Sequence, residues 1–156
     1  MKGAPAALED QGKEWRGTMT APTSCVFCGI LAGRLPARLV YDDEHHIAFL
    51  PLEHINPGHV VLIPRRHTDY LFDLDASAYQ RLWDVVAKLA PPLREAFAAK
   101  RVGVAVEGFT VPHVHVHLVP LHAADELTPA RARAVDAAEA DRLCQLIRQA
   151  LLTVRK

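Results

Sequence analysis

The stretch Pro112-His113-Val114-His115-Val116-His117-Leu118-Val119-Pro120 alternates histidine with apolar residues. Successive side chains of a β-strand point to opposite faces, so this alternation predicts a strand. We expect the three histidines to project from one face of a sheet and Val114, Val116 and Leu118 to enter the core from the other. An exposed polar sheet face is the plain alternative, but such a face more often carries Thr, Lys or Glu. The stretch therefore predicts a strand that carries a functional site.

The composition fits one compact domain that acts on small molecules. The chain has 156 residues, of which 50% are apolar, and this is enough for an adequate core. Lys plus Arg and Asp plus Glu both number 18, so the net charge gives no electrostatic case for binding nucleic acid or a membrane surface. No apolar run is long enough to span a bilayer and the N-terminus lacks a signal-peptide layout, so we expect a cytoplasmic protein.

Apolar patterning predicts the remaining elements. Residues 1–20 show no apolar periodicity, so we expect a disordered N-terminal tail before a single domain over residues 21–156. Further strands are predicted over residues 38–41, 47–50, 59–64 and 102–106. Helices are predicted over residues 24–32, from residue 75 to about residue 99, and over residues 136–153.

Local signals predict where the helices begin, end and bend. The expected caps and terminators are Ser24 and Gly33 for the first helix, Asp75 for the second, and Asp136 with Glu139 for the third. Pro91 and Pro92 predict a kink or a break in the second helix, because proline lacks the N–H of a helical hydrogen bond. Cys144 falls on the apolar stripe of the third helix and is expected to be a small core residue.

The residues around the histidine row resemble the histidine triad (HIT) family, whose signature is His-x-His-x-His followed by apolar residues. Three further blocks follow the family's order: Ser-Cys-Val-Phe-Cys-Gly-Ile at residues 24–30, Leu-Pro-Ala-Arg-Leu-Val-Tyr-Asp-Asp at 35–43, and Pro-Gly-His-Val-Val-Leu-Ile-Pro-Arg-Arg-His at 57–67. The resemblance spans roughly residues 24–122. The four blocks together make it specific, and they point to a zinc-bearing bacterial branch.

The resemblance implies a fold and an activity. The implied fold is α+β, with an antiparallel sheet of about five strands, two main helices and a C-terminal helix, in a protein that forms a homodimer. The implied activity is hydrolysis of a nucleotide phosphoramidate or phosphoanhydride, or nucleotidyl transfer, at an α-phosphate. Nucleoside phosphoramidases and dinucleoside polyphosphate hydrolases are the similar enzymes.

The resemblance also implies roles for four residues. His115 is the nucleophile that attacks the α-phosphorus and forms a nucleotidyl-histidine, which water then hydrolyses. Its other ring nitrogen must donate a hydrogen bond to fix the tautomer, and in the family a backbone carbonyl accepts it. His117 contacts the phosphate or helps the leaving group to depart. His59 occupies the family's further active-site histidine position, and Thr110 matches a small hydroxyl residue that contacts the phosphate.

The Cys25-x-x-Cys28 spacing indicates a metal site. Three cysteines are too few for a disulfide framework, and two thiolates at this spacing are typical of structural zinc. A closed tetrahedral site needs two more ligands, for which His67 and His113 are the candidates. The resemblance to zinc-bearing relatives implies these four positions. The alternative is a pair of buried free thiols beside two unrelated histidines.

Two departures from the family pattern affect the substrate-binding residues. The family usually carries an Asp that holds the ribose hydroxyls where this chain has Pro51, within Phe49-Leu50-Pro51-Leu52-Glu53. Either Glu53 substitutes for it or the ribose is recognised differently. Phe109 replaces the usual Gln before the triad and could offer a stacking surface. The expected substrate-binding residues are therefore Phe49, Glu53, Phe109 and Thr110.

Two other functions compete with this prediction. A catalytic zinc held by all three histidines is disfavoured, because steps of two residues along a strand separate them by about 6.8 Å, an awkward span for one tetrahedral ion. A zinc-stabilised nucleotide-binding or interaction module with little turnover is the alternative from another class, and the altered ribose and phosphate positions favour it. Turnover by the purified protein separates it from the enzyme.

Overall fold

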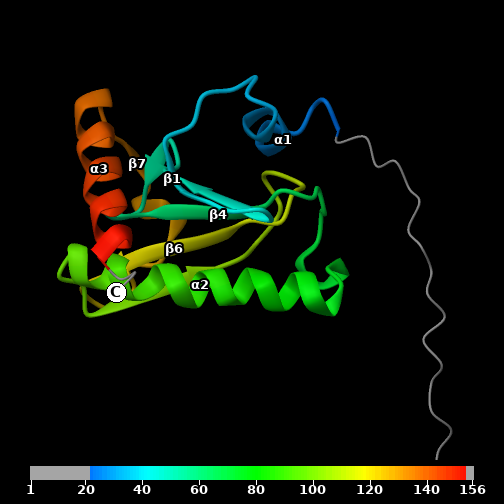
Figure 1. Cartoon of the computed structure of the whole chain (residues 1–156). Helices are drawn as coiled ribbons and strands as arrows, with labels where there is room; N and C mark the ends of the chain where they lie inside the picture. The colour runs from blue at the N-terminus through cyan, green and yellow to red at the C-terminus, as the bar shows by residue number, and fades with distance from the viewer. Residues whose placement is uncertain (1–21, 154–156) are drawn as a thin grey trace, which may run out of the picture.

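A computed structural model describes residues 22–153 of the chain (Figure 1), so the tail expected over residues 1–20 lies outside the described residues. The helices are α1 (Val26–Leu31), α2 (Ala76–Ala96) and α3 (Ala137–Thr153), with 3-10 turns η1 (Leu71–Asp73) and η2 (Pro129–Arg131). The strands are β1 (Leu39–Asp42), β2 (His46–Phe49), β3 (Glu53–His54), β4 (Val60–Pro64), β5 (Arg101–Ala105), β6 (Val116–Leu121) and β7 (Arg133–Ala134). The α+β prediction is confirmed.

A five-stranded antiparallel sheet in the order β1-β2-β4-β6-β5 forms the centre of the molecule. The histidine-bearing β6 lies between β4 and β5, and residue Val61 of β4 faces His117. The short strands β3 and β7 pair in a second small sheet that the sequence did not predict. Because two-residue strands carry almost no periodic pattern, their pairing is set by the surrounding fold.

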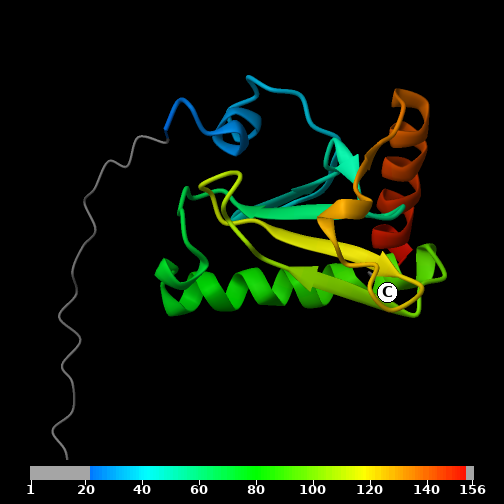
Figure 2. The ribbon, with the colours of Figure 1, turned by 180° about the vertical axis from the view of Figure 1, so that it is seen from behind.

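The two faces of the sheet are covered by different helices, as Figures 1 and 2 show, with α2 and α1 on opposite sides. One face buries Ala48, Leu62, Val116 and Leu118 against α2 and α3. The other buries Ile47, Phe49, Val61 and Ile63, with α1 packed on it through Phe27 and Ile30. Side-chain alternation along the strands thus assigns His117, opposite Val61, to the face that α1 covers.

The histidine stretch is only partly a regular strand, which corrects the prediction. β6 begins at Val116, so His113 and His115 precede it. Their segment leaves the sheet because the N–H of Val114 donates to the carbonyl of Thr68, in the loop after β4, at 2.7 Å. The predicted alternation of side chains nevertheless holds, since Val114, Val116 and Leu118 are all buried in the core.

The helix signals were confirmed with two exceptions. Asp75 caps α2 by accepting from the N–H of Ala78, and Asp136 accepts from the N–H of Glu139 before α3. The first helix is capped by Cys25 instead of Ser24, because the Cys25 sulfur accepts from the N–H of Cys28. Gly33, with φ +71°, follows its end as expected.

Of the two outcomes predicted at Pro91 and Pro92, a kink or a break, the break was wrong, since α2 runs without interruption from Ala76 to Ala96, and the kink stays a prediction. Pro92 and Leu93 are buried, with Leu93 in the core against the sheet. This packing holds the helix together where proline removes backbone hydrogen bonds. Cys144 lies in the core as predicted. No helix among residues 22–153 has the length and apolar character needed to cross a membrane.

Candidate functional site

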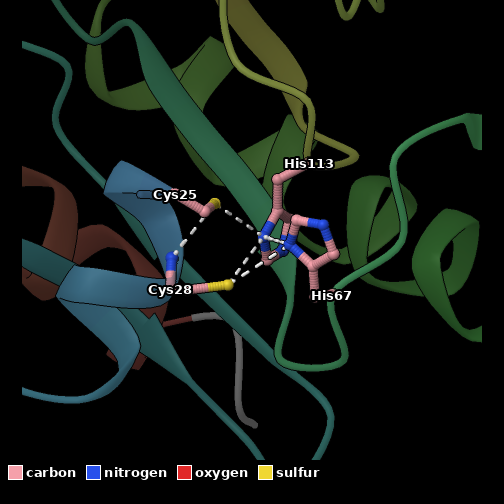
Figure 3. A group of neighbouring side chains, drawn as sticks. All are labelled: Cys25, Cys28, His67 and His113. Carbon is pink, nitrogen blue, oxygen red and sulfur yellow. Dashed lines mark hydrogen bonds between the residues drawn. The ribbon is translucent and has the colours of Figure 1, made fainter. Parts of the chain in front are cut away.

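Four potential metal ligands converge beside α1 (Figure 3). Cys25 and Cys28 lie at the start of α1, His67 lies in the loop after β4, and His113 lies just before β6. Their ligand atoms all lie within 4.8 Å of one another. Cys25, Cys28 and His113 are buried and His67 is half-buried. Residues 88 positions apart are thus brought to one point by the packing of α1 onto the sheet.

Four of the six distances between the ligand atoms match those of a tetrahedral zinc site. The Nδ1 atom of His113 lies 3.5 Å from the Cys25 sulfur and 3.6 Å from the Cys28 sulfur. The Nδ1 atom of His67 lies 3.3 Å from the Cys28 sulfur and 3.2 Å from Nδ1 of His113. With Zn–S of about 2.3 Å and Zn–N of about 2.0–2.1 Å, a tetrahedron separates sulfur from nitrogen by about 3.5 Å and two nitrogens by about 3.3 Å.

The surroundings prepare these side chains as ligands. The Nε2–H of His113 donates to the carbonyl of Pro64 at 2.8 Å, so Nδ1 keeps its lone pair and faces the sulfurs. Burial lowers the pKa of His113, which keeps the ring neutral. Burial, and then the hydrogen bond and charge of Cys25, raise the pKa of Cys28 to about 11. A divalent cation would replace these thiol protons, so metal binding here releases protons.

His115 lies next to this group, held in one tautomer. Its Nδ1 is 2.7 Å from the carbonyl of His113, so in the neutral ring Nδ1–H donates and Nε2 keeps its lone pair. The ring is buried between Phe27 and His117, each with its ring centroid 5.1 Å away. The acceptor is a backbone carbonyl within the motif, as the family resemblance implied.

His117 and His59 form a second hydrogen-bonded pair whose direction is fixed by the backbone. The N–H of Ile55 donates to Nδ1 of His59 at 3.1 Å, so the neutral His59 ring carries its proton on Nε2. That Nε2–H donates to Nδ1 of His117 at 2.9 Å. The neutral His117 ring therefore carries its own proton on Nε2, where it can donate to a ligand. Burial lowers the pKa of His59 to about 3 and of His117 to about 4, so both are neutral near pH 7.

The predicted substrate-binding residues are less closely gathered. Phe49 is buried on β2, and its ring centroid lies 5.6 Å from that of Phe27. Thr110 and Phe109 lie in the loop before the triad, and the Phe109 side chain is 89% exposed. Glu53 is exposed on β3 while its neighbour His54 is buried towards His59. In the described part of the chain, none of these four side chains hydrogen-bonds to the histidines.

Sequence reasoning missed two contributors to the site. Phe27 contacts the rings of both His113 and His115, with centroids 5.8 and 5.1 Å away. Its place between Cys25 and Cys28 on a short helix was a signal that could have found it. Asn56 fixes the turn that carries His59, and only the structure reveals its partners. Among residues 22–153, the metal-ligand group contains His113 but neither His115 nor His117, which counts against one zinc held by the whole triad.

The depressed histidine pKa values predict a loss of stability in mild acid. An unfolded histidine titrates near 6.5, so between pH 6.5 and about 4 the unfolded state binds more protons than the folded state. The stabilisation from His59 and His117 is complete above pH 6.5 and is lost as the pH falls. One pKa unit corresponds to about 1.4 kcal/mol. Each histidine should therefore lower the free energy of unfolding by about 2 kcal/mol when the pH falls from 7 to 5. Urea unfolding at pH 7, 6 and 5 measures this loss.

A His59→Gln variant is the control for this pH dependence. Glutamine keeps a donor of similar reach but does not titrate, so the slope of stability against pH should become shallower by about one proton's contribution. An unchanged slope in the variant, or a flat curve in the parent protein, would contradict the assignment.

Comparison with known proteins identifies the family of this chain. The family model for the HIT domain matches residues 32–124. "Protein hit" of Bacillus subtilis is 30% identical over 109 residues, which cover 65% of this chain and 74% of that protein. An asymmetrical bis(5′-nucleosyl)-tetraphosphatase of Schizosaccharomyces pombe is 35% identical over 94 residues, covering 57% of this chain and 52% of that protein.

A solved structure supports the same relationship. The crystal structure of a zinc-bound histidine triad family protein from Mycobacterium smegmatis superposes with a TM-score of 0.72 at 29% identity, covering 84% of this chain and 95% of that chain. The fold, the order of the motifs and the match over more than half of the sequence agree. The chain belongs to the HIT domain family.

Proposed function

We propose that this protein is a nucleotide hydrolase or nucleotidyl transferase that acts at an α-phosphate through a covalent intermediate on His115. The observation that carries the proposal is the hydrogen bond from Nδ1 of His115 to the carbonyl of His113, which leaves Nε2 as a free nucleophile. The Nε2–H of His117 lies on the adjacent ring as a donor. A nucleophile and a hydrogen-bond donor on one face are what two-step displacement at phosphorus requires.

The proposed reaction has two displacements. Nε2 of His115 attacks the α-phosphorus, the N–P bond forms, and the bond to the leaving group breaks with its electron pair going to that group. His117 donates a hydrogen bond to the phosphate or to the departing atom and so stabilises the charge that develops there. Water then attacks the same phosphorus and loses a proton to solvent, and the electron pair of the N–P bond returns to His115. In a transfer reaction another acceptor takes the place of water.

We propose phosphoramidates or phosphoanhydrides of nucleotides as the substrate class. The tetraphosphatase of Schizosaccharomyces pombe supports the phosphoanhydride arm, although the matched region covers only 52% of that protein. Thr110 and Phe109 would contact the phosphate and the base from the loop before the triad, and Phe49 would contact the nucleoside. Glu53 is the candidate for a sugar contact in place of Pro51, which the comparison of ribose and deoxyribose substrates below tests. The test is turnover of an adenosine phosphoramidate and of a dinucleoside tetraphosphate by the purified protein.

We propose that Cys25, Cys28, His67 and His113 hold a structural zinc ion. Two thiolates and two imidazoles fill all four tetrahedral positions, so the ion would stabilise the fold and leave no position for substrate. The zinc-bound relative supports this identity of the metal. The metal ligand His113 also supplies the carbonyl that orients His115, so an ordered metal site helps to order the nucleophile.

A nucleotide-binding module with little turnover is the second candidate. The observation that favours it is the weak ribose and phosphate environment: Pro51 replaces an acidic residue, and Phe109 points into solvent. Nucleotide binding without turnover of either substrate would select it. Homodimer formation, implied by the family resemblance, stays a prediction that light scattering on the purified protein would test.

Pro51 predicts weak discrimination between ribose and deoxyribose. Proline carries no side-chain hydrogen-bonding group, and Glu53, two residues further on, is exposed on the face of β3 opposite to His54. Ribo- and 2′-deoxyribonucleotide substrates should therefore have similar kcat/KM values. The difference in transition-state stabilisation that these values give should be less than the roughly 1–3 kcal/mol expected when a buried polar partner is left unpaired. Paired kcat/KM measurements check this. A strong preference for ribose that Glu53→Gln abolishes would show that Glu53 has taken over the contact.

A further inference from the structure

Asn56 is the buried centre of a polar network next to the turn that carries His59. Its Nδ2 donates to the carbonyl of Pro120 on β6 at 2.8 Å and to the carboxylate of Glu126 at 3.0 Å. Its Oδ1 accepts from the guanidinium of Arg131 at 3.1 Å. The residue is 6% exposed, and every polar atom of its side chain has a partner. The amide of Asn56 thus links the His59 turn to Pro120 on β6, to Glu126 in the following loop and to Arg131 on η2.

Glu126 and Arg131 complete the network. The same Glu126 oxygen accepts from the N–H of His122 at 2.7 Å, and the other lies 3.7 Å from the Arg131 guanidinium. The Glu126 side chain is 14% exposed. Hydrogen bonds from His122 and the neighbouring backbone, then from Asn56, together with the charge of Arg131, hold the pKa of Glu126 below its ordinary value. The carboxylate is therefore a fixed anionic acceptor for the Asn56 amide.

The turn from Ile55 to His59 is clamped on its other side by close packing. Gly58 has φ +89°, and a Cβ atom at this position would lie 2.5 Å from the Phe97 ring and 2.8 Å from Pro120. The N–H of His59 donates to the carbonyl of Asn56 at 3.1 Å. The backbone of the turn is thus packed against Phe97 and Pro120 at Gly58, and a hydrogen bond links His59 to Asn56.

We propose that Asn56, Glu126 and Arg131 form a positioning network that sets the tautomers of His59 and His117. The effect that this inference expects on turnover rests on the proposed function. The two neutral tautomers of imidazole are chosen by whichever hydrogen bond the ring makes. The Ile55 N–H, adjacent to Asn56, makes that choice for His59, and His59 makes it for His117. Displacing the turn would let His117 present a lone pair to the substrate instead of a donor.

The Asn56→Asp variant tests this most directly. The substitution keeps the shape but replaces the amide donor with an acceptor that faces the Pro120 carbonyl and the Glu126 carboxylate. We expect kcat to fall about tenfold with KM little changed, which is less than the about 10²–10⁴-fold that a positioned proton donor contributes, because the donor is displaced and not removed. Long-range ¹H–¹⁵N spectra of the imidazoles should show single Nε2–H tautomers for His59 and His117 in the parent protein and mixed tautomers in the variant.

A second pair of variants keeps the test independent of folding defects at Asn56. Glu126→Gln retains an oxygen acceptor and should keep near-parental kcat and tautomers, whereas Glu126→Ala should behave like Asn56→Asp. Asp141→Ala is the matched control, because it removes a carboxylate paired with an arginine, Arg38 at 2.7 Å, outside this network. It should leave kcat and the tautomers unchanged.

The outcomes separate the network from the proposed function. Parental tautomers and kcat in both Asn56→Asp and Glu126→Ala would overturn the inference, and so would equal losses in Glu126→Gln and Glu126→Ala. If the parent protein shows no turnover but the tautomers change in the two variants, the positioning role stands and the proposed function fails.

Discussion

Replacing His115 with asparagine should abolish turnover while nucleotide binding persists. Asparagine matches the size of the imidazole and can donate to the His113 carbonyl, but its amide cannot form the bond to phosphorus. The expected loss in kcat is several orders of magnitude, on the order of 10³–10⁶-fold, as for other nucleophiles removed from a catalytic unit. Hydrolysis of an adenosine phosphoramidate and calorimetric titration with the nucleoside monophosphate measure the two properties separately.

His117→Asn is the matched comparison for the nucleophile. It removes the donor on the neighbouring ring but leaves Nε2 of His115 free to attack, so kcat should fall less steeply, by about 10²–10⁴-fold. Acid-quenched mass spectrometry should trap a nucleotidyl adduct on His115 in the parent protein. Near-parental turnover in His115→Asn, or the absence of any adduct with a good leaving group, would exclude covalent catalysis and favour the binding module.

A variant that lacks one zinc ligand should lose the bound zinc and, with it, much of its free energy of unfolding. We expect about one zinc per chain in protein purified without chelator, and little or none in Cys25→Ser. The binding energy of a structural zinc is folding energy of about 10–16 kcal/mol in small zinc domains, comparable to the whole stability of a protein. A fall of at least about 10 °C in Tm is therefore expected. Elemental analysis and thermal unfolding provide the two measurements.

Cys144→Ser is the control for the zinc prediction. Cys144 is as buried as Cys25, at 4% exposure each, but it lies in the core away from the four ligands. The control makes the same chemical change at a buried thiol and should retain the metal. A parent protein that is free of zinc and loses no stability with chelator would rule out the site.

The sequence was most informative where the chemistry itself requires a pattern. The His/apolar alternation predicted which side chains face the core, and Val114, Val116 and Leu118 are there. Asp75 and Gly33 act where their local hydrogen bonding and backbone freedom predict. The break allowed for at Pro91 and Pro92 does not occur, because packing of the same helix against the sheet outweighs the local signal of the two prolines.

The sequence by itself determined the family, the order of the three helices and of the strands of the large sheet, and the residue types available for metal and phosphate chemistry. These follow from short-range periodicity and motif spacing, which a linear chain records directly. Only the tertiary structure decided which tautomer each histidine adopts, that Phe27 borders both the metal group and His115, and that Asn56 ties the His59 turn to Glu126 and Arg131. Those properties depend on hydrogen bonds and ring contacts between residues that lie far apart in the sequence, such as Asn56 and Arg131, and no local pattern encodes such partners.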